Sequence, residues 1–223
     1  MADFDDEIAT RLKHHLAHAP INLRNAIEYS ALAPGKRIRP KLLLAVGQLL
    51  GAPAEPSLNA AIALELIHCF TLIHDDLPCM DDDDFRRGRP SNHKVHGEGV
   101  ALLAGDAIIP LAFEILLASP NNAPHPAPNL KIELVRTLAH HMGALGVIGG
   151  QASELLLTPK STLAELRAMH AAKTGALFVA AVDLGRILGG LDADSTGGRH
   201  LIAFGVALGV AFQVADDVED SET

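Results

Sequence analysis

The sequence predicts an all-α protein that folds as a large helical bundle. Apolar residues recur with helical rather than alternating spacing in nearly every segment, and good helix formers dominate. Runs of β-branched residues are scarce and aromatic residues make up only 4% of the chain, which argues against strands. With 223 residues, 48% of them hydrophobic, the chain can bury one sizeable core, so we expect a single domain over residues 1–223.

Turn-forming residues separate the expected helices, because Gly and Pro interrupt helical segments. The Pro- and Asn-rich stretch from Ser119 to Asn129 is interpreted as a surface loop, since the segments on both sides are apolar enough to share one core. The other breaks are Pro34-Gly35, Gly51–Pro53, Arg86–Pro90, Thr158-Pro159 and Gly189–Gly198. The expected helices are residues 5–18, 21–32, 39–50, 57–76, 97–118, 130–156, 161–190 and 198–220.

The composition excludes several partners and compartments. A formal net charge of −9 argues against a nucleic acid partner, which requires a basic surface. Cys69 and Cys79 cannot form a disulfide framework and suit a reducing compartment, and the acidic N-terminus lacks the apolar core of a signal peptide. The longest apolar run, residues 201–214, is shorter than the ~20 residues that cross a bilayer. We therefore expect a cytoplasmic protein without stable membrane insertion.

Six of the ten residues from Asp75 to Asp84 are aspartates, and they follow an apolar helix. Anions at the C-terminal end of a helix oppose its dipole, so a solvated acidic helix end is a poor alternative to a bound cation. A second acidic segment, Asp216–Asp220, ends another apolar helix. Because Mg²⁺ prefers oxygen ligands that it shares with substrate phosphates, the two segments together predict a magnesium site for a diphosphate.

Helix geometry decides which aspartates share a face. Asp216 and Asp220 are four residues apart and lie on the same face of a helix. Asp75 and Asp81 are six residues apart and would point in nearly opposite directions on a regular helix. Pro78 lies between them, and we expect it to distort the chain and bring Asp81 back toward Asp75.

Two basic segments supply cations for a diphosphate. Gly35–Pro40 contains Lys36, Arg37 and Arg39, and Arg86–Pro90 contains three arginines directly after the aspartates. Arg binds phosphate oxygens with a planar fork, while Lys acts as a point charge. Pairing of the arginines with neighbouring aspartates is the alternative, but it does not account for the first segment.

Isolated polar residues interrupt several apolar helices, namely His68, Lys173, Thr174 and Gln213. Each is a weak signal alone, because a lysine within an apolar helix usually extends its amine to solvent. Cys79 is interpreted as a small packed hydrophobe, since no Cys/His quartet suited to zinc is present.

In this order the motifs resemble those of the trans-isoprenyl diphosphate synthases, the polyprenyl synthetase family. The matching segments are Gly35–Pro40, Asp75–Gly88, Gly97–Asp106, Gly149–Gln151 and Phe212–Asp220. The resemblance covers nearly the whole chain and implies a bundle of the isoprenoid synthase type with a central active-site cavity. The extent of apolar helix surface further predicts a homodimer.

The resemblance also implies roles for individual residues. Isopentenyl diphosphate would be bound by Gly35, Lys36, Arg39, His68 and Arg87. The allylic diphosphate would be bound by Arg86, Lys173, Thr174 and Gln213. Three Mg²⁺ ions, with Mn²⁺ as the alternative metal, would be bound by Asp75, Asp76, Asp81, Asp216, Asp217 and Asp220. The catalytic set comprises Asp75, Asp81, Lys173, Thr174, Gln213 and Asp216.

These roles imply a prenyltransferase that works by ionisation, condensation and elimination. Metal and cationic side chains would stabilise the diphosphate that leaves dimethylallyl or geranyl diphosphate. The apolar interior would shield the allylic cation from water. The double bond of isopentenyl diphosphate would then attack, and the released diphosphate is a reasonable acceptor for the proton.

Phe70 and Thr71 lie one turn before Asp75, where the growing tail would descend. In the family, an aromatic residue at the position of Phe70 together with a two-residue insertion such as Pro78-Cys79 is typical of bacterial farnesyl diphosphate synthases. We therefore expect farnesyl diphosphate as product. Because Thr71 is small, geranylgeranyl diphosphate is the alternative.

The sequence departs from the family pattern at three points. Glu154 stands where Asp is usual, and Glu219 stands where an apolar residue is usual. The sequence also stops at Thr223, so the family's C-terminal helices are expected to be lacking, and a non-catalytic subunit of a heteromeric prenyl synthase stays open. A class I terpene cyclase or head-to-head synthase also ionises prenyl diphosphates on aspartates, but it would not need the Gly35–Pro40 segment.

Overall fold

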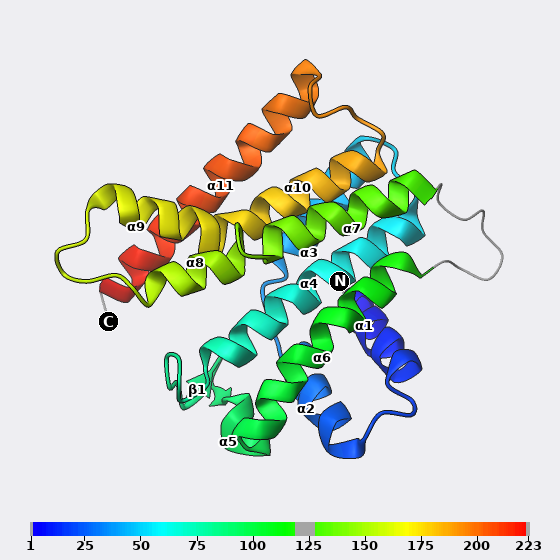
Figure 1. The fold of residues 1–223 in the computed structure, drawn as a ribbon. Helices are drawn as coiled ribbons and strands as arrows, with labels where there is room; N and C mark the ends of the chain where they lie inside the picture. The colour runs from blue at the N-terminus through cyan, green and yellow to red at the C-terminus, as the bar shows by residue number, and fades with distance from the viewer. Residues whose placement is uncertain (1, 119–127, 222–223) are drawn as a thin grey trace. The chain divides into compact units, whose positions relative to one another are not determined.

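The computed structural model describes residues 2–118 and 128–221, and Figure 1 shows that helices dominate them. The all-α prediction is confirmed. The chain divides into two compact units, residues 1–37 with 65–117 (unit 1) and residues 38–64 with 118–223 (unit 2). Most of the loop expected at 119–129 lies outside the described residues, and the expectation of a single domain stays a prediction.

Unit 1 is built around helices α2 and α6, which pack against each other and against the short helix α5. Asn92 joins α5 to α2, because its amide donates to the Ala26 carbonyl at 2.8 Å and to the Ser30 hydroxyl at 2.7 Å. The elements of unit 1 are α1 (Ala2–His15), α2 (Ile21–Ala31), the second half of α4 (Ala54–Asp75), β1 (Phe85–Arg86), β2 (Arg89–Pro90), α5 (Asn92–His96) and α6 (Glu98–Leu117).

The short antiparallel pair β1–β2 is not anticipated by the sequence pattern. Phe85 pairs with Pro90, and Arg86 pairs with Arg89. The two loop residues, Arg87 and Gly88, have φ of +53° and +74°, and positive φ at both central positions defines the tight turn that suits the twist of a hairpin. The basic segment after the aspartates is therefore a hairpin rather than an open loop.

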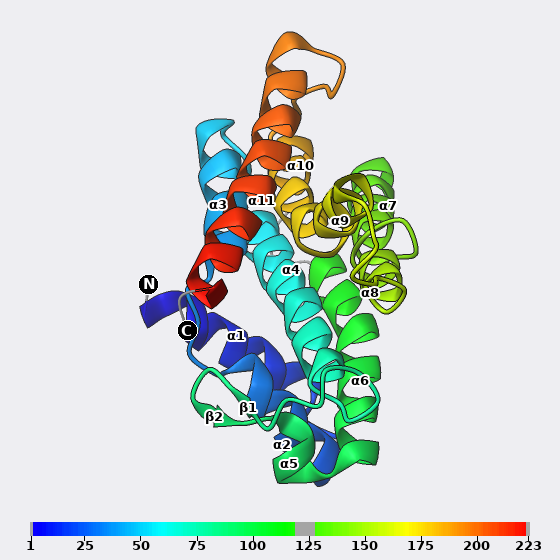
Figure 2. The ribbon, with the colours of Figure 1, turned by 90° about the vertical axis from the view of Figure 1, so that its left-hand side faces the viewer.

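Unit 2 is centred on α10, which packs against α3, α7 and α11 (Figure 2). Nearly every residue of α10 is buried, and only Asp183 and Arg186 among its residues are charged. Gly185 allows the close approach of α3, because a Cβ there would lie 2.9 Å from the Leu43 carbonyl oxygen. The elements of unit 2 are α3 (Ile38–Leu49), the first half of α4, α7 (Pro128–Met142), α8 (Val147–Glu154), α9 (Leu163–His170), the π-helical turn η1 (Ala171–Gly175), α10 (Ala176–Leu188) and α11 (Thr196–Ser221).

Two expected helices are interrupted in the structure. The helix expected over 130–156 breaks between α7 and α8 around Gly146, where a Cβ would lie 1.8 Å from the His141 carbonyl oxygen, so only glycine fits. The helix expected over 161–190 consists of α9, η1 and α10. In both cases the apolar periodicity continues across the interruption, which is why periodicity alone does not reveal it.

Among the described residues, three helices are long and apolar enough to cross a membrane by length and composition alone: α4, α6 and residues 196–215 of α11. The apolar run of residues 201–214 is shorter than α11, which contains it, so the length of that run does not exclude α11 as a membrane-crossing helix. In α4, 78% of the apolar window is buried inside the protein, against 17% in α11. The apolar character of α4 therefore serves the protein interior.

Candidate active site

The first acidic segment begins where α4 ends. α4 stops at Asp75, and the chain then turns back so that the Asp81 N–H donates to the Asp75 carbonyl at 2.9 Å. The Met80 N–H donates to the Leu77 carbonyl at 2.8 Å within the same turn. Pro78 therefore lies in a tight reversal that returns the Asp81 backbone to Asp75. The expectation that the chain is distorted here and brings the two aspartates together is met at the level of the backbone.

Asp76 and Arg86, which were expected to bind different ligands, bind each other. The Arg86 Nε and Nη2 donate to Asp76 Oδ1 at 2.8 and 2.5 Å, and Nη2 also donates to Asp83 at 2.7 Å. Asp76 is only 2% exposed. Burial raises the pKa of the Asp76 carboxyl above its usual range, although the Arg86 guanidinium opposes that shift. The sequence alternative of arginine–aspartate pairing is thus realised for this pair.

Helix α6 supports the end of α4 through His74, a residue that the sequence reasoning missed. The His74 Nε2 lies 3.0 Å from the Leu102 carbonyl and 3.9 Å from the Asp106 carboxylate. A Cβ at Gly105 would lie 2.1 Å from His74 Nε2, so a side chain there would displace the ring. The segment Gly97–Asp106 therefore abuts the residue that immediately precedes Asp75. The available signal was the spacing of His74 one turn after Phe70.

Phe70 and Thr71, the residues expected to set product length, are buried in the turn of α4 before Asp75, and their role stays a prediction. The Phe70 ring packs edge-on against the His74 ring, with 5.8 Å between centroids. The Thr71 hydroxyl donates to the His68 carbonyl at 2.8 Å, so it is turned toward its own helix. Both side chains point into the protein interior and not toward solvent.

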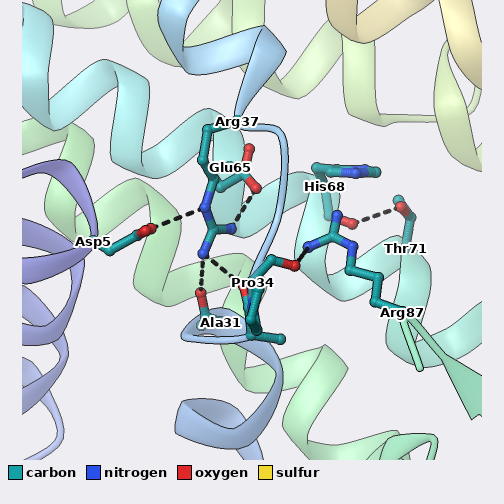
Figure 3. A network of polar contacts seen from close by, with 9 residues as sticks. Asp5, Ala31, Pro34, Arg37, Glu65, His68, Thr71 and Arg87 are labelled. Carbon is teal, nitrogen blue, oxygen red and sulfur yellow. Dashed lines mark hydrogen bonds and ion pairs between the residues drawn. The ribbon is translucent and has the colours of Figure 1, made fainter. Parts of the chain in front are cut away.

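The first basic segment presents its three cations in three different ways. Lys36 is exposed. Arg37 is buried, and its guanidinium donates to Glu65, Asp5 and two backbone carbonyls (Figure 3). Arg39 belongs to unit 2, where its guanidinium lies over the rings of Phe178 and Phe212 at 4.7 and 5.7 Å.

Arg87 joins the hairpin to the first basic segment. Its Nη1 donates to the Pro34 carbonyl at 3.1 Å, and a Cβ at Gly35 would lie 2.6 Å from the same nitrogen. A side chain at Gly35 would therefore displace the Arg87 guanidinium from this position. The structure thus brings Gly35 and Arg87 together, two of the residues expected to bind isopentenyl diphosphate. His68 lies half-buried on α4 in the same unit.

In unit 2, Lys173 and Thr174 lie in the π-helical turn η1, a rare conformation that occurs frequently at functional sites. The Thr174 hydroxyl donates to Gln213 Oε1 of α11 at 2.5 Å. The two residues, both expected to bind the allylic diphosphate, are thus in direct contact. The Lys173 amine pairs with Glu154 of α8. Glu154, which stands where the family usually has Asp, therefore has a cation beside it.

Glycines let two helices, α8 and α11, approach η1 closely. A Cβ at Gly150 of α8 would lie 2.3 Å from the Lys173 amide nitrogen, and a Cβ at Gly209 of α11 would lie 2.7 Å from the Gly175 Cα. The segment Gly149–Gln151, singled out in the sequence, thus packs directly on Lys173. The side-chain nitrogen and oxygen of Gln151 are buried without a hydrogen-bond partner among the described residues, which is uncommon in native proteins.

The second acidic segment lies on the last turns of α11. The side chains of Asp216, Asp217 and Asp220 fall outside the described residues, so their role as metal ligands stays a prediction. Among the described residues, one further group offers metal-ligand atoms, all within 4.8 Å of one another: Asp82, Asp84 and His93. Asp84 in this group already pairs with Lys94 at 2.6 Å.

The sequence profile of the family described as Polyprenyl synthetase matches residues 21–223. The chain belongs to the polyprenyl synthetase family. Every residue assigned above to a diphosphate or metal site lies within the matched range, whereas α1 lies before it. The resemblance stated from the motifs is confirmed.

Relatives in this polyprenyl synthetase family include enzymes of different product length. A farnesyl diphosphate synthase of Geobacillus stearothermophilus is 43% identical over 204 residues, covering 91% of this chain and 67% of the relative. Geranylgeranyl pyrophosphate synthase 12 of Arabidopsis thaliana, a chloroplastic protein, is 44% identical over 205 residues, covering 90% of this chain and 56% of the relative. The chain thus spans little more than half the length of this plant relative.

The crystal structure of an FPP/GFPP synthase from Zymomonas mobilis, in its apo form, has the same fold. It matches with a TM-score of 0.89 and 38% sequence identity, covering 99% of this chain and 78% of that one. The fold predicted for the polyprenyl synthetase family, a helical bundle of the isoprenoid synthase type, is confirmed by this match.

Proposed function

We propose that this chain is a Mg²⁺-dependent prenyltransferase that condenses isopentenyl diphosphate with dimethylallyl or geranyl diphosphate to give farnesyl diphosphate. The observation that carries the proposal is the reversal at Pro78, which returns the Asp81 backbone to Asp75, five residues after the buried Phe70. Two aspartates close to an apolar, aromatic helix turn suit a substrate with a diphosphate head and a hydrocarbon tail.

The carboxylates of Asp75, Asp81 and Asp216, with Asp217 and Asp220 in support, are the proposed metal ligands. Such all-oxygen donor sets suit Mg²⁺, with Mn²⁺ as the alternative. When bound, Mg²⁺ supplies charge that stabilises the leaving diphosphate. Asp76 contributes by holding Arg86, because its carboxylate accepts two hydrogen bonds from that guanidinium.

The cationic side chains of the motifs are proposed to bind and orient the substrates. Isopentenyl diphosphate is the proposed ligand of Lys36, Arg39, His68 and Arg87. The allylic diphosphate is the proposed ligand of Arg86 and Lys173. The contact of Thr174 with Gln213 fixes the amide of Gln213, so that its dipole is set before the substrate arrives.

Geranylgeranyl diphosphate synthase is the second candidate function. Its support comes from the 44% identity to the Arabidopsis thaliana protein of that name. The small Thr71 beside Phe70 also leaves less bulk below the aspartates than a second aromatic residue would. The difference between the two candidates therefore depends on whether the Phe70 ring closes the path of the growing tail.

A product assay on the 223-residue chain tests the proposal. The purified chain is incubated with Mg²⁺, isopentenyl diphosphate and geranyl diphosphate, and the products are sized by chromatography. We expect farnesyl diphosphate, no product from Asp75→Ala, and longer products from Phe70→Ala. Asp183→Asn, on α10, is the folded control with unchanged product. Geranylgeranyl diphosphate from the parent chain would favour the second candidate, and no prenyl product would favour a non-catalytic subunit of a heteromeric synthase.

The assembly and location of the chain are part of the proposal. We expect a cytoplasmic homodimer, since exposed apolar side chains lie along α11, among them Phe204, Val206, Val210 and Val214. Light scattering on the eluted protein measures the mass, and twice the 23.5 kDa of one chain is the expected value. The monomer mass at micromolar concentration would contradict the dimer.

A further inference from the structure

Arg37, the middle cation of the first basic segment, is turned inward and surrounded by acceptors (Figure 3). Its Nη1 donates to Glu65 at 2.6 Å and its Nε donates to Asp5 at 3.0 Å. Its Nη2 donates to the Ala31 carbonyl at 3.1 Å and to the Ala33 carbonyl at 2.9 Å. All three guanidinium nitrogens are therefore engaged inside the protein, and this cation does not face a diphosphate.

The backbone at Arg37 depends on these contacts. Its φ is +49°, in the left-handed region that residues other than glycine rarely occupy. Such a conformation persists only where the surrounding structure fixes it. Here the guanidinium holds the carbonyls of Ala31 and Ala33, so the side chain of Arg37 fixes the segment that leads up to Arg37 itself.

A second arginine holds the same segment from the hairpin. Arg87 donates to the carbonyl of Pro34, the residue after Ala33, and Figure 3 shows Pro34 between the Arg37 and Arg87 side chains. The carbonyls of residues 33 and 34 are thus held by different arginines. The exposed Lys36 follows directly, so a shift of this segment moves Lys36 and removes the contact of Arg87 with Pro34.

We propose that Arg37 is a positioning residue for the isopentenyl diphosphate subsite, and that Glu65 is the group that holds it in place. The inference rests on the proposed function, because it assigns Lys36 and Arg87 to that ligand. Glu65 is buried and carries the charge that balances Arg37, whereas the Asp5 side chain is 53% exposed and screened by water. Asp5 also lies on α1, outside the residues that match the family. Glu65 should therefore matter much more than Asp5.

Three single variants separate positioning from stability. Glu65→Gln keeps the shape and an acceptor oxygen but removes the charge, and Asp5→Asn does the same for the exposed partner. Asp183→Asn is the matched control, because it removes the carboxylate that pairs at 2.7 Å with another buried arginine, Arg186, in unit 2. Each chain is titrated with isopentenyl diphosphate by calorimetry, and amide hydrogen exchange is read at Gly35 and Lys36.

We expect Glu65→Gln to weaken isopentenyl diphosphate binding about tenfold, as loss of a supporting partner typically does. Exchange at Gly35 and Lys36 should become faster. In turnover, the KM for isopentenyl diphosphate should rise while kcat and the KM for the allylic substrate stay within about twofold. Asp5→Asn and Asp183→Asn should bind as the parent does. Faster exchange with unchanged affinity in Glu65→Gln would overturn the proposal.

A double variant covers the case in which Glu65→Gln does not fold. Arg37→Met with Glu65→Leu replaces the buried pair by apolar side chains of similar size, a change that proteins often tolerate. It lacks the hydrogen bonds to Ala31 and Ala33, so the same loss of affinity is expected, and parent-like affinity would overturn the proposal. If the parent chain itself fails to bind isopentenyl diphosphate, the proposed function fails, and the exchange data still decide whether Arg37 and Glu65 order the segment.

Discussion

The segments 31–37 in unit 1 and 171–175 in unit 2 are both irregular stretches of backbone that carry cations assigned to a diphosphate, yet different forces hold them. Segment 31–37 is held by charge, since a buried guanidinium joins Glu65 to the carbonyls of Ala31 and Ala33. Segment 171–175 is held by close packing of backbone against backbone at Gly150 and Gly209.

The difference teaches how each segment presents its lysine. Arg37 takes up the inward-facing acceptors, and Lys36 beside it is exposed. At η1 the packing is tight, because no side chain fits between α8 and the backbone of Lys173. We therefore expect removal of a charge to damage the first segment and addition of a methyl group to damage the second.

The largest effect is expected for Glu65→Gln. Removing one partner of a buried ion pair leaves the other charge uncompensated, so the free energy of unfolding should fall by about 3 kcal/mol. Urea denaturation followed by circular dichroism measures it. Asp5→Asn is the control, and its effect should stay below about 1 kcal/mol, because this partner is largely exposed. Equal losses for the two variants would show that Glu65 is not the principal partner.

The next largest effect is expected for Gly150→Ala. The new Cβ would lie 2.3 Å from the Lys173 amide nitrogen, a backbone atom, so α8 or η1 must shift. Overpacking of this kind lowers the free energy of unfolding by about 2 kcal/mol. Gly99→Ala is the matched control, since nothing lies within 4 Å of a Cβ there. That helical site should be neutral or gain up to about 1 kcal/mol.

Glu154→Gln tests whether charge contributes to η1 as well. Its carboxylate pairs with Lys173, but the two side chains are 34% and 24% exposed. An ion pair so open to water contributes about 0–1 kcal/mol, so the free energy of unfolding should change little. If Glu154→Gln lowered the free energy of unfolding as much as Glu65→Gln in the same denaturation experiment, charge would stabilise both segments equally. That result would contradict the proposed difference between them.

Much of the fold could be predicted from the sequence because local signals agree with the tertiary structure. The helices expected over 21–32 and 39–50 are found at Ile21–Ala31 and Ile38–Leu49. The tight hairpin at residues 85–90 could not be predicted, since its strands have two residues each and its turn uses Arg87 in a left-handed conformation. The π-helical turn is equally hidden, because residues 171–175 read as ordinary helix and the glycines that permit it lie on other helices.

The sequence predicts those features of the site that follow from a backbone constraint such as proline. It does not predict which of several possible partners a charged side chain binds. Pro78 cannot continue a regular helix, so the return of Asp81 to Asp75 followed from the sequence. The inward turn of Arg37 did not, because Arg37 and Lys36 are adjacent cations that look alike in sequence. What separates them is Glu65, a carboxylate 28 residues away along the chain.

The last prediction concerns the two cysteines, which both lie in unit 1. Cys69 is 6% exposed and lies one turn after Glu65, and burial, reinforced by the charge of Glu65, raises the pKa of its thiol to about 12. Cys79 is exposed. Since the thiolate is the reactive form, iodoacetamide at neutral pH should modify Cys79 and spare Cys69. Mass spectrometry of the digested protein measures both rates.

In Glu65→Gln, the rate at Cys69 should rise, because the variant removes the charge and loosens the structure around it. If the rate follows opening of unit 1, a loss of about 3 kcal/mol corresponds to roughly a hundredfold increase. Gly150→Ala changes unit 2 and should leave Cys69 protected if the units open independently. Faster modification of Cys69 in both variants would mean that the two segments, although held by different forces, belong to one cooperative structure.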